Sequence, residues 1–140
     1  MNVFQEKILI KTIKRGIHLI TPQIESSIVE LKTIEKGLMH LFLQHTSASL
    51  IINENADPTV REDMFKYFNK IVPKNEPYFK HNFEGPDDMP AHIKSTIIGN
   101  QLTLPISNGK LSLGTWQGIY LYEHRDAPPL RKIITTIIGV

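Results

Sequence analysis

Cysteine is absent from the 140 residues of this chain. Its absence excludes disulfide bridges, a thiolate nucleophile and any sulfur-rich zinc site. A metal in this protein would therefore be bound by nitrogen and oxygen atoms. The lack of cysteine also fits a cytoplasmic protein, and the cytoplasm is the compartment that we expect.

Long hydrophobic runs are missing as well. None approaches the roughly 20 residues that are needed to span a bilayer, and the last one, at residues 133–140, is interrupted by Thr135 and Thr136. The N-terminus lacks the basic and then apolar pattern of a signal peptide. We expect no membrane-spanning segment and no membrane partner.

The chain carries little net charge, formally +2 at pH 7, and its basic residues are scattered. A surface that binds nucleic acid would be denser in lysine and arginine, so we expect no nucleic-acid partner. The P-loop, the dinucleotide fingerprint GxGxxG and the nucleophile motif GxSxG are also absent. The enzyme classes that depend on those motifs are therefore disfavoured.

The composition that remains is that of a globular protein, with 41% hydrophobic and 21% charged residues. A chain of this length forms one domain of ordinary size with a real core. We expect a single domain over residues 1–140.

Strand patterns occur along the whole chain. Residues 3–14 and 17–20 predict two strands joined as a hairpin at Gly16. Residues 38–43 are apolar at nearly every position, which predicts a central strand covered on both faces. Asn108-Gly109 is a strong hairpin turn signal. Further strands are predicted at residues 50–52, 102–106, 110–113, 118–125 and 130–138.

Two sequences that combine a capping residue with proline predict the main helices. Thr21-Pro22 is followed by apolar residues at helical spacing until Gly37, and Asp57-Pro58 is followed by an apolar face over residues 60–71. A shorter helix is predicted at residues 91–98. Helices in the first two thirds and strands throughout predict an α+β fold with two main helices and a mainly antiparallel, β-sandwich-like core.

The segment at residues 73–90 has no apolar period, and long segments of this kind are usually functional or mobile. His81 and His92 lie in it or just after it, and His45 follows the strand at residues 38–43. Three histidines make a common catalytic zinc set that leaves one position open. The carboxylates Glu84, Asp87 and Asp88 would orient these ligands or hold a harder ion such as magnesium. A solvated acidic loop is the alternative.

A second polar cluster covers residues 45–58. Asp57 is best explained as the cap of the helix that begins at Pro58, whereas Glu54 is a candidate general acid or base, or a contact to a substrate amine. The free amides at the helix start suit a phosphate, with Arg61 to assist. A surface salt bridge is the alternative for Arg61.

A third cluster surrounds Trp116, where Gly114 and Gly118 flank the one tryptophan of the chain. Glycine lets a backbone approach a ligand closely, and tryptophan stacks on planar rings. A tight connection with a core tryptophan is equally consistent. On the strand that follows, Glu123 and Arg125 are functional if they point inward.

Three ordered stretches closely resemble the YjbQ-like family, also called secondary thiamine-phosphate synthase-like proteins. They read HTSASLIINENADPTVREDM at residues 45–64, YFKHNFEGPDDMPAHIKS at 78–95 and LSLGTWQGIYLYEHR at 111–125. The resemblance implies an α+β fold with a β-sandwich-like core, assembly as a homotrimer, and three histidines around a metal. The matching histidines are His45, His81 and His92.

The resemblance also implies which other residues belong to the site. Its acidic, catalytic candidates map onto Glu54, Asp57, Glu84, Asp87 and Asp88. Its substrate-binding candidates map onto Arg61, Lys94, Ser95, Trp116, Gln117, Glu123 and Arg125.

Together these features predict a metal-dependent enzyme that acts on a small phosphorylated or heterocyclic metabolite. The divalent metal is expected to be zinc, with magnesium as the alternative. The resemblance implies weak thiamine-phosphate synthase activity, whereas a histidine-bound zinc fits a hydrolase or lyase equally well. The alternative to an enzyme is a trimeric module that binds a metal or ligand without turnover.

Overall fold

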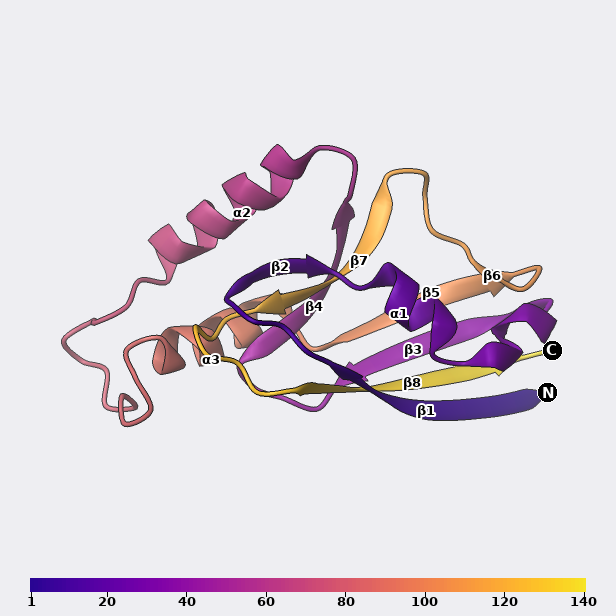
Figure 1. The fold of residues 1–140 in the computed structure, drawn as a ribbon, viewed down its shortest axis with the longest axis horizontal. Coiled ribbons are helices and arrows are strands. Elements are labelled where there is room, and N and C mark those ends of the chain that lie inside the picture. The colour runs from indigo at the N-terminus through magenta and orange to yellow at the C-terminus, as the bar shows by residue number, and fades with distance from the viewer.

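Two antiparallel sheets form the framework of the protein, and the computed structural model describes all 140 residues. The five-stranded sheet has the order β1 (Asn2–Ile10), β8 (Arg131–Gly139), β3 (Lys36–Leu43), β5 (Gln101–Ser107) and β6 (Lys110–Leu111). The three-stranded sheet has the order β2 (Gly16–Leu19), β7 (Gln117–Glu123) and β4 (Ala48–Glu54) (Figure 1). The predicted α+β fold with a sandwich-like core is confirmed.

The core fills the space between the two sheets and holds 17 buried apolar residues. Successive side chains of a strand point to opposite faces, so β3 and β8 give every second residue to this core, whereas β7 is buried at six consecutive positions. In β8, Ile133, Thr135 and Ile137 are fully buried while the residues between them are not. Burial of these aliphatic side chains is the main favourable term that holds the sheets together.

The helices differ in how firmly they are held. Helix α3 (Asp88–Ile98) packs on β4, where Ala91 is fully buried and the Ser95 hydroxyl donates to the carbonyl of Ala48 at 3.0 Å. Helix α2 (Pro58–Ile71) has no buried residue and lies at the margin of the molecule (Figure 1). As predicted, Asp57 caps α2 by accepting from the Thr59 amide at 2.9 Å. No helix is long and apolar enough to cross a membrane.

The predicted hairpin between the first two strands is wrong. β1 pairs with β8 along all nine of its residues, whereas β2 pairs with β7 in the other sheet. Pairing with the four-residue β2 would leave most amides of β1 without a partner, so the distant strand β8 makes the longer ladder. Residues 11–15 therefore carry the chain from one sheet to the other.

The continuous helix predicted after Thr21 is also wrong. Helix α1 (Thr21–Ser26) ends after six residues, Ile28 is extended with φ −129° and ψ 109°, and a 3₁₀ turn η1 (Val29–Thr33) follows. The Ser27 hydroxyl and amide both bond to the Ile24 carbonyl, so local side-chain bonding competes with helix continuation. Thr21 does not cap the helix; its hydroxyl accepts from the Ile119 amide at 2.9 Å.

Strand β3 is central in its sheet but is covered on one face only, which corrects the prediction of two covered faces. Met39, Leu41 and Leu43 are buried, whereas Leu38 is 52% exposed and Phe42 is 39% exposed. The outer face of this sheet has no helix packed over it, so the apolar residues of that face remain in contact with solvent.

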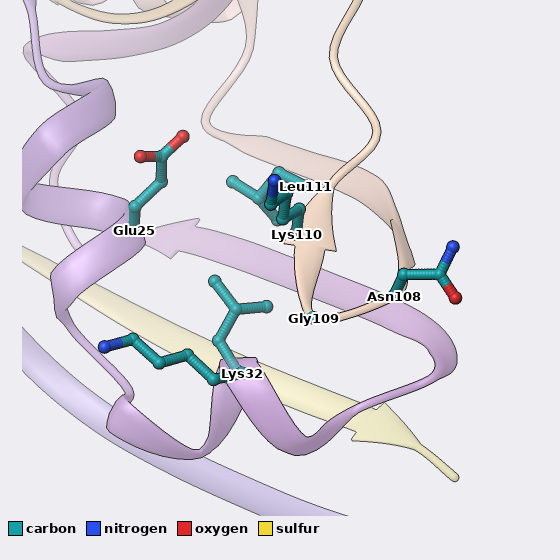
Figure 2. Close-up of a pocket in the computed structure, with 7 residues that line it drawn as sticks. Glu25, Lys32, Asn108, Gly109, Lys110 and Leu111 are labelled. Carbon is teal, nitrogen blue, oxygen red and sulfur yellow. The ribbon is translucent and has the colours of Figure 1, made fainter.

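The predicted Asn108-Gly109 turn is confirmed, and it joins β5 to β6. Both residues have positive φ, 52° and 74°, as such two-residue hairpins require. A cavity of about 550 Å³ lies between this turn and η1 (Figure 2). It contains none of the predicted site residues; its lining is Glu25, Leu31, Lys32, Asn108, Gly109, Lys110 and Leu111.

Candidate functional site

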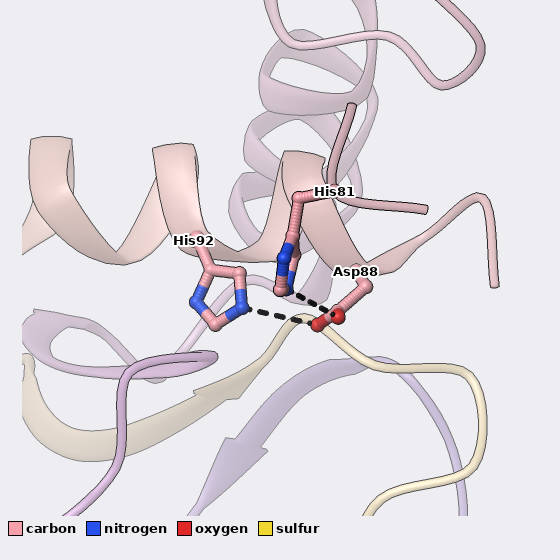
Figure 3. Close-up of side chains that lie close together, drawn as sticks. All are labelled: His81, Asp88 and His92. Carbon is pink, nitrogen blue, oxygen red and sulfur yellow. Dashed lines mark ion pairs between the residues drawn. The ribbon is translucent and has the colours of Figure 1, made fainter. Parts of the chain in front are cut away.

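Three side chains suited to metal binding meet at the start of α3 (Figure 3). Asp88 is the first residue of the helix, His92 lies one turn later on the same face, and His81 comes from the preceding loop. His81 Nε2 is 2.9 Å from Asp88 Oδ2, and His92 Nε2 is 3.1 Å from Asp88 Oδ1. The structure thus brings together two of the three predicted histidines and one of the predicted carboxylates.

The ring of His92 is oriented from behind by the backbone. Its Nδ1 lies 2.9 Å from the carbonyl oxygen of Thr46, and a carbonyl only accepts, so Nδ1 carries a hydrogen. In a neutral imidazole Nε2 then bears a lone pair, and this lone pair points at a carboxylate oxygen of Asp88. Two lone pairs repel each other, so a proton or a metal ion is required between these atoms.

A half-buried arginine, Arg125, holds the acidic side of this cluster. Arg125 Nη1 is 3.1 Å from Asp88, Nε donates to Asp87 at 2.9 Å, and Nη2 donates to the Glu84 carbonyl at 3.0 Å. Burial alone would raise the pKa of Asp87, but the Asp126 amide and Arg125 outweigh it and hold that pKa below its usual value. Glu84 is less constrained, since its side chain is 66% exposed and 3.6 Å from Arg125 Nη1.

The cluster opens into a cavity of about 450 Å³ that also exposes His45 and Arg131. The lining is polar apart from Phe83 and Pro129: Gln44, His45, Thr46, Ser47, His81, Phe83, Glu84, Asp88, His92, Arg125, Pro129 and Arg131. A second cavity of about 300 Å³ shares His45, Thr46 and His92 and continues to Ser95, Thr96, Gly99 and Asn100. The two cavities flank the His92 ring and together provide room for a small polar molecule.

His45 takes part in a different contact from the other two histidines. Its Nε2 accepts a hydrogen bond from the Lys132 amide at 3.0 Å, and it lies outside the close group of His81, Asp88 and His92. Burial, followed by the charges of Arg131 and Lys132, lowers the pKa of His45 and favours its neutral form. Its assignment as a third metal ligand stays a prediction.

Known proteins resemble this chain along nearly its whole length. A family model described as "UPF0047 protein YjbQ-like" matches residues 6–140. The chain belongs to this family. It is 53% identical over 136 residues to the UPF0047 protein YjbQ of Salmonella typhimurium, covering 97% of this chain and 98% of that one. It is 43% identical over 135 residues to UPF0047 protein sll1880 of Synechocystis, covering 96% and 91%.

Solved structures agree with the fold of this YjbQ-like chain. A YbjQ-like protein of unknown function from Sulfolobus solfataricus superposes with a TM-score of 0.87 at 28% identity, covering 99% of each chain. A conserved hypothetical protein from Thermus thermophilus superposes with a TM-score of 0.79 at 32% identity, covering 91% of this chain and 96% of the other. Neither of these names states an activity.

Four predicted residues of the YjbQ-like motifs lie at the opposite end of the three-stranded sheet. β4 and β7 pair so that Ala48 faces Glu123 near the histidines and Glu54 faces Gln117 at the far end. Six residues of strand separate these ends by roughly 20 Å. Glu54, Asp57, Trp116 and Gln117 therefore do not line the histidine cavity of their own chain.

Contacts at this far end explain several of those residues without a ligand. The Trp116 carbonyl accepts from the Asn55 amide at 2.9 Å, while its indole is 63% exposed. Arg61, the fifth predicted residue in this region, donates to the Tyr120 hydroxyl at 3.0 Å, and that hydroxyl donates to the Glu54 carbonyl. Arg61 thus binds an aromatic hydroxyl in this chain, and its predicted contact with a phosphate stays a prediction.

Lys94 and Ser95 leave α3 in different directions. Lys94 is 2% exposed, and its amine donates to Asn69 Oδ1 at 2.7 Å. Burial, followed by the charges of Arg15 and Lys74, lowers the pKa of Lys94 to about 8. Ser95 lines the smaller cavity beside His92. Ser95 therefore lies beside the candidate site, whereas Lys94 is placed inside the protein.

Glu123 points inward, as its predicted role in substrate binding requires. Its partner is Arg131, a residue that the sequence patterns did not identify as part of the site. Arg131 Nε donates to Glu123 Oε1 at 2.6 Å, Nη2 bonds to Oε2, and both residues are almost fully buried. A signal for Arg131 did exist. It has the same strand phase as the buried residues Ile133, Thr135 and Ile137, and a charged residue in that phase must be paired inside the protein.

Proposed function

We propose that this YjbQ-like protein is a metal-dependent enzyme whose divalent ion is held by His81, Asp88 and His92. One observation supports this proposal. With a neutral His92 ring, His92 Nε2 and Asp88 Oδ1 would point their lone pairs at each other, and a metal ion between them removes this repulsion. The Thr46 carbonyl behind His92 is the kind of partner that fixes the tautomer of metal-binding histidines.

The donor set fits zinc better than magnesium. Two imidazole nitrogens and one carboxylate oxygen match the protein ligands of catalytic zinc sites with an open position, whereas magnesium prefers oxygen donors throughout. Donor atoms of a tetrahedral zinc site lie roughly 3.3 Å apart. Here one donor atom from each of the three residues lies within 4.8 Å of the others, and each histidine Nε2 is 2.9 or 3.1 Å from one of the two Asp88 oxygens. A divalent ion in this position supplies a Lewis acid and lowers the pKa of a bound water.

The carboxylates around the site have separate roles in this proposal. Asp88 binds the ion and Asp87 fixes Arg125, because both are buried and held by Arg125 at about hydrogen-bond distance. Glu84 is the carboxylate at the cavity rim that is free to move, so it is our candidate for proton transfer. Glu54 is too far along β4 to serve this cavity within one chain.

We propose a small phosphorylated metabolite as the substrate in preference to a bare heterocycle. The cavity is lined mainly by charged and polar side chains, including Arg125 and Arg131; apart from the histidines, Phe83 is its one aromatic residue, and Trp116 lies at the far end of the sheet. Thiamine-phosphate synthase-type transfer remains one reaction to test, because its substrates are phosphorylated. Hydrolysis or elimination at a phosphate ester is the other.

The alternative function is a trimeric module in which a bound metal stabilises the fold without turnover. One observation favours it: Asp88 and Arg125 already tie α3, the loop at Glu84 and the end of β7 into one network. A bound ion would add one more link between α3 and the loop that carries His81. In that case metal removal lowers the melting temperature, and no phosphorylated compound in a substrate panel is consumed.

Elemental analysis of untagged, extensively dialysed protein tests the proposed metal site. We expect near-stoichiometric zinc per chain, and loss of that zinc in His92→Ala and Asp88→Asn. The control is His40→Ala, since His40 bonds Gln101 on the outer face of the five-stranded sheet. Protein that holds no transition metal, or variants that retain it fully, would contradict the site. Assay of phosphate esters with loaded and stripped protein then separates the enzyme from the module.

A further inference from the structure

Two hydrogen-bond donors in the histidine cavity have no partner in the protein. One belongs to Arg131 and the other to His45, and both residues line the cavity of about 450 Å³. They come from adjacent parts of the structure, because His45 accepts from the amide of Lys132, the residue next to Arg131. Unpaired donors on a buried cation and a neutral ring make a place where an anion would be bound.

Arg131 is held in place by hydrogen bonds along one edge of its guanidinium. Nε and Nη2 bind the carboxylate of Glu123, and Nη2 also donates to the Ser47 carbonyl at 3.2 Å. Nη1 makes no hydrogen bond in the protein. It is also not sealed from solvent. The side chain as a whole is only 1% exposed, so its remaining opening is toward the cavity that it lines.

His45 offers a donor for a similar geometric reason. A backbone amide only donates, so the Lys132 amide requires a lone pair on His45 Nε2. The neutral ring therefore carries its hydrogen on Nδ1, and Nδ1 has no partner in the protein and is not sealed from solvent. The lowered pKa of His45, caused first by burial and then by Arg131 and Lys132, agrees with a neutral ring.

We propose that His45 and Arg131 bind the phosphate group of the substrate, with His45 acting as an anion-binding donor in this cavity and not as a metal ligand. This inference rests on the proposed function, because it places the phosphate beside the ion held by His81, Asp88 and His92. Arginine with a fixed, partly free guanidinium is well suited to phosphate oxygens. A tetrahedral oxyanion also has enough oxygens to reach both donors and the ion.

The carboxylates that share the cavity do not oppose such binding. Asp88 is paired with Arg125 and flanked by His81 and His92, and the charge of Glu123 is matched by Arg131. Glu84 is the remaining carboxylate of the lining, and its side chain is mostly in solvent, where its field is screened. A divalent ion would add two positive charges beside the phosphate. Phosphate should therefore bind more tightly to zinc-loaded protein than to stripped protein.

Calorimetric titration of inorganic phosphate into zinc-loaded and stripped protein tests this inference. We expect His45→Ala and Arg131→Lys to weaken phosphate binding by about tenfold or more, because each removes a hydrogen bond to a charged group. Arg131→Lys keeps a cation opposite Glu123, and thermal melting confirms that each variant is folded. His45→Gln is the rescue variant, since its amide can accept from Lys132 and still donate; it should bind phosphate within a few fold of wild type. His18→Ala, at a histidine that lines neither cavity, is the unaffected control.

The outcomes separate this inference from the proposed function. Zinc content that is unchanged in His45→Ala, together with weakened phosphate binding, supports both. Zinc lost in His45→Ala would make His45 a metal ligand and overturn the inference. Phosphate binding that is unchanged in folded His45→Ala and Arg131→Lys would also overturn it, with the metal site intact. Acetate bound as tightly as phosphate would identify a carboxylate site and contradict the phosphate assignment. Protein that binds phosphate through these residues but holds no metal would contradict the proposed function alone.

Discussion

Lys94 is an amine that the fold buries without a carboxylate partner. Its one hydrogen-bond acceptor is the Asn69 amide oxygen, which also accepts from Arg15 Nη1 at 3.0 Å. The pKa of Lys94 falls to about 8, first through burial and then through Arg15 and Lys74. The folded state therefore binds this proton less tightly than the unfolded chain does, and the charged amine destabilises the fold.

The first prediction concerns the replacement of this amine by an apolar side chain of similar length. Lys94→Met should raise the melting temperature by a few degrees at pH 7, because the buried charge is removed and Arg15 still binds Asn69. Wild-type stability gains a contribution as pH rises from about 8 toward 10.5, where only the unfolded state keeps the proton. The advantage of Lys94→Met should thus shrink over that range.

Thermal melts of both proteins from pH 7 to pH 10 give the required measurement. Lys110→Met is the control, since Lys110 is exposed and burial does not act on it. An advantage for Lys94→Met that stays constant with pH would mean that the charge of Lys94 is not the cause. A lower melting temperature at pH 7 would show that the bond to Asn69 outweighs the cost of burial.

Residue types identified part of the candidate site from the sequence, and strand phase would have identified more. His81, His92 and Asp88 stood out because they occur in a polar segment where packing residues are missing. The distance of Glu54 and Trp116 from them depends on the pairing of β4 with β7, which no local pattern encodes. The donor role that we propose for His45 depends on the Lys132 amide, which is 87 residues away.

At the scale of the element, α2 is the least supported helix and depends most on its own cap. None of its residues is buried, and Asp57 accepts from both the amide and the hydroxyl of Thr59, at 2.9 and 2.7 Å. These two bonds lower the pKa of Asp57, so the ionised cap is favoured at neutral pH and is lost as pH falls through that lowered value.

The second prediction is therefore that, in Asp57→Ala, α2 unfolds locally more readily than the rest of the protein. Amide exchange over residues 58–71 should become about fivefold faster, because a cap bond that holds the first turn is lost. Strands β3 and β8 should keep their protection. Asp57→Ser restores a capping oxygen and should behave like wild type, and Asp63→Ala controls for the loss of a carboxylate within the helix. Equal exchange in all four proteins would contradict the capping role.

Elements with a local signal were predicted well, and elements that depend on long-range pairing were not. The Asn108-Gly109 turn, helix α2 and strand β8 follow from turn, cap and alternation patterns in neighbouring residues. The hairpin of β1 with β2 failed because both strands find better partners more than 100 residues away. The apolar spacing after Thr21 correctly marked Ile24, Ile28 and Leu31 as buried, although the chain there is not one helix.

At the scale of the whole molecule, the outer face of the five-stranded sheet carries an apolar row that nothing covers. The strand register aligns Val3 with Ile138, Ile138 with Leu38, and Leu38 with Pro105, so the row crosses four strands. All four side chains are exposed. A contiguous apolar row of this kind is typical of a surface that meets another protein, and the homotrimer implied by the family resemblance offers such a partner.

The last prediction tests this assembly and the surface that forms it. Light scattering after gel filtration should give about three times the 16.0 kDa of one chain, and Leu38→Lys combined with Ile138→Lys should give the mass of one chain. Two lysines in one row would repel their copies and leave charge buried at the contact. Glu76→Lys also adds two positive charges, in the loop before α3, and should leave the mass unchanged. A trimer that survives the paired lysines would move the contact to another face, and a wild-type monomer would contradict the assembly itself.

Since about 20 Å of β4 separates Glu54 from the histidines, an intact trimer is also the arrangement in which residues from both ends of the sheet can belong to one site.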